Sequence, residues 1–126
     1  MQKSEIEKII QARLKDAEVL LKASRFDGSV YLCGYAIELA LKARICRTLQ
    51  WDEYPIGGKY STFKTHDLDV LLHLTGVEDN VKLKYITEWS IVARWNPEAR
   101  YKSIGNVQEA DAKDMLDSAK EMIKQL

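Results

Sequence analysis

The densest group of side chains that could bind a ligand lies in residues 94–101, whose sequence is RWNPEARY. We call it the RWNPEARY segment. Arginine binds phosphate through a planar fork of donors, and aromatic rings stack on nucleobases, so this combination is typical of nucleotide and single-stranded nucleic-acid sites. The predicted ligand-binding residues here are Arg94, Trp95, Asn96, Arg100 and Tyr101. Alternatively, the two rings close one end of the fold, and the arginines pair with glutamates from elsewhere in the chain.

A second candidate is Glu38, which stands within the apolar run VYLCGYAIELAL of residues 30–41. Burying a carboxylate costs free energy unless the group is paired or hydrogen-bonded. Lys42 follows one helical turn later, and an arginine of the RWNPEARY segment is the other possible partner. One interpretation is an ion pair that fixes the helix register. The other places Glu38 on the floor of a ligand pocket beside Tyr31 and Tyr35, which share its helix face.

His66 begins a predicted helix, directly after Thr65. This position favours a role in helix capping, or as a bridge between the preceding loop and the helical bundle. An acid/base or ligand role is the alternative, because histidine titrates near neutral pH. His73 lies among leucines, where a structural role is the default.

No metal site or cofactor is predicted from the sequence. Two histidines without a matching acid cluster do not indicate metal binding. Cys33 and Cys46 lack zinc-site spacing and are thirteen positions apart in one predicted helix. That spacing separates them by about 20 Å, too far for a disulfide, so both are predicted to be free thiols.

The chain of 126 residues carries 19 basic and 19 acidic residues, so it has no global field that would attract a polyanion. Any phosphate site must be local. The length suits one domain covering residues 1–126. Because no apolar run approaches 18 residues and the start does not resemble a signal peptide, we expect a cytoplasmic protein without membrane association.

The elements that must position these residues are helices, because apolar residues recur at intervals of three and four throughout. The first helix is predicted over 4–24, with Ser4 as its N-cap and a break around Gly28. The second is apolar on nearly all sides over 30–41 and is therefore central. Three more are predicted over 66–74, 79–95 and 112–126, with a long loop at 50–65. The predicted fold class is all-α, an up-and-down helical bundle of four to five helices.

Three strings in the sequence carry a family resemblance: YLCGYAIELALKA at residues 31–43, THDL at 65–68, and RFDG at 25–28. With these strings the chain resembles a bacterial and archaeal subgroup of the HEPN family. The resemblance implies a bundle that forms a homodimer and is related to the helical domain of nucleotidyltransferases. It also implies, for many members, a separate minimal nucleotidyltransferase as partner. Other members are metal-independent ribonucleases of toxin and defence systems.

The ribonuclease members use an arginine followed, after four to six residues, by a histidine. That spacing is absent here: the positions before His66 are residues 59–61 (KYS), and those before His73 are residues 66–68 (HDL). Arg94 is at most a remnant of the motif. We therefore predict a dimeric, non-catalytic module that binds a nucleotide or RNA, or that partners a nucleotidyltransferase. The alternatives are a degenerate ribonuclease using Arg94 with His66 or Tyr101, and a purely structural dimerisation scaffold.

Overall fold

The computed structural model describes residues 1–98 and 105–126, and these residues form helices and connections without a β-strand. The elements are α1 (Lys3–Lys22), α2 (Phe26–Leu49), a 3₁₀-helix (Gly58–Phe63), α3 (Leu68–Thr75), α4 (Glu78–Lys84), α5 (Ile86–Val92) and α6 (Glu109–Gln125). The predicted all-α helical bundle is confirmed.

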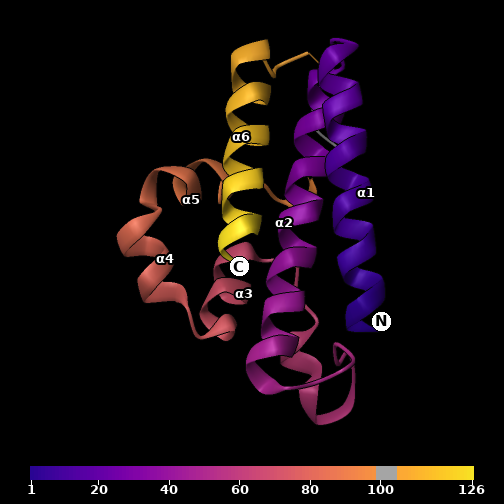
Figure 1. Cartoon of the computed structure of the whole chain (residues 1–126), viewed down its shortest axis with the longest axis vertical. Helices are drawn as coiled ribbons and strands as arrows, with labels where there is room; N and C mark the ends of the chain where they lie inside the picture. The colour runs from indigo at the N-terminus through magenta and orange to yellow at the C-terminus, as the bar shows by residue number, and fades with distance from the viewer. Residues whose placement is uncertain (99–104) are drawn as a thin grey trace.

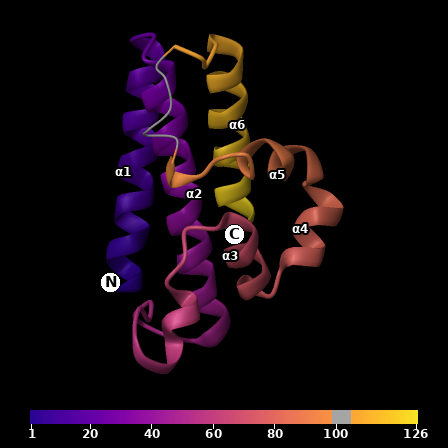
Figure 2. The same cartoon turned by 180° about the vertical axis from the view of Figure 1, so that it is seen from behind.

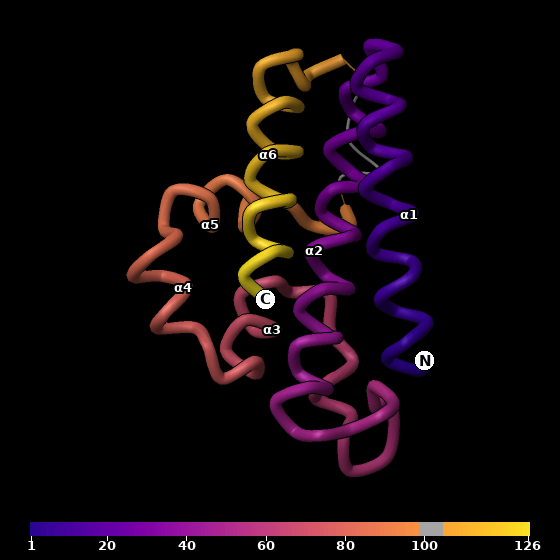
Figure 3. Tube along the Cα trace, viewed as in Figure 1, coloured from indigo at the N-terminus to yellow at the C-terminus, as the bar shows by residue number. Residues whose placement is uncertain are grey.

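Three long helices lie side by side, and the short helices pack against one flank of them (Figure 1). α2 runs antiparallel to α1, whereas α6 starts at the same end as α2 and runs parallel to it (Figures 1 and 2). α2 contacts α1, α3 and α6, and α5 packs on α6. α4 lies farthest from α1, as the trace in Figure 3 also shows.

α2 is the centre of the fold, as its apolar composition predicts. Ile37, Leu41 and Ile45 are fully buried. Burying a side chain of this size contributes about 1.5–3 kcal/mol, so this helix holds much of the stabilising apolar contact. Both cysteines are free and buried in the same helix. Burial raises the pKa of the Cys33 thiol to about 12, so this thiol stays protonated at neutral pH and is not a nucleophile.

The boundary between the first two helices differs from the prediction. Gln2 is the N-cap of α1 and makes no side-chain cap hydrogen bond, so the predicted Ser4 cap is wrong. Gly28 lies inside α2, where a Cβ would come 3.2 Å from Leu20 of α1. The chain turns earlier, at Ser24, whose φ is 60°. Close packing of the two helices explains this glycine, which the sequence pattern had marked as a break.

The helices that follow also differ in their bounds. The predicted helix over 79–95 is divided at Tyr85, where φ is −128° and ψ is 34°, and its second half ends at Val92. α3 begins at Leu68 rather than at residue 66, because the Asp67 side chain accepts hydrogen bonds from the backbone N–H groups of Asp69 and Val70. It ends at Thr75, and its C-cap is Gly76, with a φ of 80° that glycine adopts without strain.

The predicted loop at 50–65 is held by aromatic packing. Trp51 packs edge-on against Tyr60 and Phe63, and Phe63 also packs against Tyr54. The Tyr54 hydroxyl donates to the Phe63 carbonyl oxygen, and Tyr54 is buried. These aromatic rings therefore pack against one another at the C-terminal end of α2.

Trp95 fixes the chain after α5 against the middle of α2. Its ring lies on Gly34, where an added Cβ would overlap the ring atoms. Trp95 is buried although it lies outside any helix. The absence of a side chain at Gly34 therefore allows residues 93–98 to lie directly on the α2 backbone. Among the described residues, no helix is both long and apolar enough to cross a membrane.

We predict that Gly34→Ala lowers the free energy of unfolding by about 1–3 kcal/mol, because the new methyl group displaces the Trp95 ring. Urea unfolding followed by tryptophan fluorescence measures the change. The matched control is Gly28→Ala in the same helix, where the nearest atom is the end of a flexible leucine 3.2 Å away, and where alanine favours the helix. Equal effects from the two substitutions would contradict the proposed contact.

Candidate functional site

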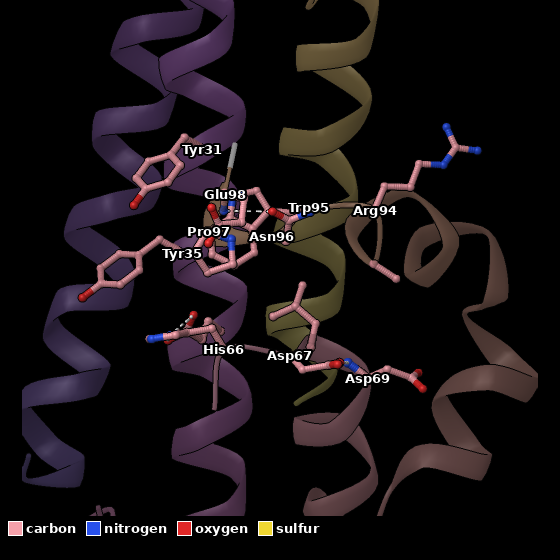
Figure 4. Close-up of a pocket in the computed structure, with 13 residues that line it drawn as sticks. Tyr31, Tyr35, His66, Asp67, Asp69, Arg94, Trp95, Asn96, Pro97 and Glu98 are labelled. Atoms are coloured by element: carbon pink, nitrogen blue, oxygen red, sulfur yellow. Dashed lines mark hydrogen bonds and ion pairs between the residues drawn. The ribbon is translucent and has the colours of Figure 1, made fainter. Parts of the chain in front are cut away.

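A hollow of about 570 Å³ opens between α2, the start of α3 and the chain that follows α5 (Figure 4). We call it the aromatic pocket. Its lining residues are Tyr31, Tyr35, Glu38, His66, Asp67, Leu68, Asp69, Ala93, Arg94, Trp95, Asn96, Pro97 and Glu98. Six of the residues that the sequence predicts as ligand contacts therefore lie around one cavity. They come from two distant parts of the chain.

Aromatic rings form one wall of the pocket. Tyr31 and Tyr35 are one helical turn apart on α2, and both are half-buried. The ring centroids of Tyr31 and Trp95 are 5.9 Å apart, with the rings tilted by 50°. Within residues 1–98 and 105–126, the Trp95 indole nitrogen has no hydrogen-bond partner. The wall thus offers two accessible ring surfaces beside a third ring that holds the segment in place.

Glu38 lies on the pocket floor and is only 2% exposed. Its carboxylate is 3.0 Å from the Lys42 ammonium, so the ion pair predicted from the helical spacing is present. It also lies 3.0 Å from Nδ1 of His66, which is 28 positions away in sequence. Charge and hydrogen bonding therefore compensate the burial of this carboxylate. The two interpretations of Glu38 are compatible, because the paired residue also lines the pocket.

His66 connects the end of the 50–65 loop to α2. The cap of α3 is Asp67 rather than His66, so of the predicted structural roles the bridging one is present. The His66 side chain is 66% exposed. Nδ1 of His66 faces Glu38, and the other ring nitrogen has no hydrogen-bond partner among the described residues.

Arg94 lies at the rim, and its guanidinium points away from His66 and from the tyrosines (Figure 4). The Glu38 carboxylate therefore contacts Lys42 and His66 rather than Arg94. The predicted contacts from Arg100 and Tyr101 lie outside the described residues.

The sequence reasoning missed the acidic character of the pocket. Asp67, Asp69 and Glu98 line it together with Glu38, and Asp69 is 3.3 Å from the Lys82 ammonium. The signal for Asp67 was its place in the THDL string, whereas nothing in the local sequence marks Glu98 as a lining residue. Within the described part of the chain, no group of three His, Cys, Asp or Glu side chains is placed to hold a metal ion.

Comparison with protein families identifies the chain. The model of the HEPN domain matches residues 11–126, which is nearly the whole length, so the chain belongs to the HEPN family. It is therefore a helical module of the nucleotide-binding and ribonuclease type. Neither a search of curated proteins nor a search of solved structures gave a match.

We predict that Lys42→Met lowers the free energy of unfolding by about 3 kcal/mol, because it leaves the Glu38 charge buried without its cation. The double variant Glu38→Gln/Lys42→Met should recover much of that loss, since no charge then remains to be desolvated. Urea unfolding at pH 7 of Lys42→Met, Glu38→Gln and the double variant gives the three values. Lys124→Met is the control, because Lys124 is 75% exposed, and its pair with Glu121 should contribute about 0.5 kcal/mol or less. If the effects of Glu38→Gln and Lys42→Met on the free energy of unfolding simply add in the double variant, the two side chains are not coupled and the prediction is wrong.

Proposed function

We propose that residues 1–126 form a single HEPN module that binds an unpaired nucleobase, of a nucleotide or of RNA, in the aromatic pocket and does not itself catalyse a reaction. The observation that carries this proposal is the stripe of Tyr31 and Tyr35 facing a cavity of about 570 Å³ with Arg94 at its rim. A cavity of this size is in the range of small-molecule sites.

The geometry of the wall supports stacking. Tyrosine rings provide flat apolar surfaces, and a base stacked on an aromatic side chain gains about 1–3 kcal/mol. Trp95 stabilises the wall because its ring is buried and packs beside Tyr31. A base at the Tyr31 and Tyr35 rings would therefore meet surfaces that are already in position, which lowers the entropic cost of binding.

The module acts in this proposal as a homodimer, and a minimal nucleotidyltransferase is its candidate protein partner. Membership of the HEPN family supports both statements. The absence of the arginine-to-histidine spacing in the sequence supports the non-catalytic role. A purely structural dimerisation scaffold would need no open pocket.

A degenerate ribonuclease is the second candidate function, and one observation favours it. The contact between Glu38 and Nδ1 of His66 orients an exposed imidazole at the pocket, as a general base requires. The outward direction of Arg94 opposes it, because the developing charge on a phosphate would then lack a cation from this residue (Figure 4).

We predict that Tyr35→Ala weakens binding of a short single-stranded RNA or a nucleotide by roughly 5- to 150-fold, since one stacking surface is lost. Fluorescence anisotropy with labelled RNA and calorimetry with nucleotides give the dissociation constants. Tyr35→Phe keeps the ring and should bind within a few-fold of the unaltered protein. Leu83→Ala, at a side chain that is 80% exposed and outside the pocket, is the second control. If the unaltered protein binds neither RNA nor any nucleotide, the proposal fails.

We expect no cleavage of single-stranded RNA by the purified protein during prolonged incubation without metal ions. Gel electrophoresis of end-labelled RNA measures this, and His66→Gln is the matched variant. RNA cleavage that the His66→Gln substitution abolishes would establish the ribonuclease function in place of the non-catalytic one.

A further inference from the structure

We infer that the aromatic pocket selects its ligand by the base and leaves the phosphates outside, and that it prefers bases carrying an amino group, guanine foremost, over uracil. This inference rests on the proposed function and adds the class of ligand. It follows from the charges that line the cavity, which are the opposite of those in a phosphate site.

The charged side chains that line the cavity are predominantly acidic. Glu38, Asp67, Asp69 and Glu98 line the cavity, against Arg94 and the exposed His66. Glu38 and Asp69 are partly compensated by Lys42 and Lys82. Arg94 points out of the pocket (Figure 4). A phosphate on the floor would therefore be repelled, and the arginine that could offset this repulsion points away from it.

The helix end beside the pocket does not reverse this conclusion. A helix N-terminus attracts anions because its first N–H groups are unpaired and its dipole is positive there. In α3 the Asp67 carboxylate already occupies that position, with distances of 3.0 Å to the N–H of Asp69 and 3.2 Å to that of Val70. The site that would otherwise bind a phosphate thus holds a fixed negative charge.

A nucleobase offers what these carboxylates can bind. The Asp67 cap uses Oδ1 only, and its other oxygen has no hydrogen bond among the described residues. A carboxylate oxygen accepts hydrogen bonds and cannot donate them. Guanine carries two adjacent donors, N1–H and the 2-amino group, and cytosine and adenine each carry an amino group. Uracil carries a single N–H between two carbonyl oxygens, which a carboxylate repels. Stacking alone does not separate the bases, because each base has a π-face.

The test compares guanosine, GMP and GTP by calorimetry at pH 7 with EDTA present, and then uridine and inosine, which lacks the 2-amino group of guanosine. We expect guanosine to bind at least as tightly as GMP and about tenfold more tightly than GTP. We expect uridine to bind about tenfold more weakly than guanosine, with inosine between them.

The matched variant is Asp67→Asn. Asparagine caps a helix as well as aspartate does, so the fold is retained while the charge is removed. The preference for guanosine over GTP should fall several-fold in this variant, and a thermal melt checks that α3 remains intact. An unchanged preference in the folded variant would overturn the assignment of charge selection to this side chain.

Two other outcomes separate this inference from the proposed function. If GTP binds more tightly than guanosine, or uridine as tightly as guanosine, the pocket binds nucleotides but the inferred selectivity is wrong. If no nucleoside, nucleotide or single-stranded RNA binds, the proposed function fails and this inference fails with it.

Discussion

The arrangement around the pocket depends on one constraint, the burial of the Glu38 carboxylate in the middle of the central helix. At 2% exposure this group cannot be hydrated, so the protein must supply its partners. Lys42 supplies a cation from the next turn of α2, and His66 supplies a ring nitrogen from the residues just before α3. The chain between α2 and α3 is therefore tied to α2 at the point where the pocket opens.

The same ion pair connects the pocket to the aromatic packing of the 50–65 loop. The Lys42 ammonium lies 5.3 Å from the centroid of the Tyr54 ring, in addition to its contact with Glu38. Tyr54 in turn donates its hydroxyl hydrogen to the carbonyl oxygen of Phe63. Burial raises the pKa of the Tyr54 hydroxyl, so it remains a donor well above neutral pH. Loop, ion pair and pocket floor thus form one connected polar and aromatic network.

The opposite side of the pocket is set by steric fit rather than by charge. Trp95 packs directly on the α2 backbone because Gly34 has no side chain, and this contact determines where residues 93–98 lie. The sequence suggested a binding role for this segment from its composition alone. It left open whether Trp95 contacts a ligand or closes one end of the fold, and it gave no sign that Arg94 would point outward, because both depend on the direction in which the chain leaves α5 (Figure 4).

Local periodicity and composition were sufficient to predict that the chain is helical, that α2 is central, and that Glu38 needs a partner. Each of these follows from neighbours within one or two helical turns. The division at Tyr85 was not visible, because apolar residues keep helical spacing on both sides of it. The pairing of Glu38 with His66 and the convergence of Asp67 and Glu98 on one cavity join residues 28 or more positions apart. Only the packing of helices against one another decides such contacts, since no local pattern encodes which distant side chain will share a buried space.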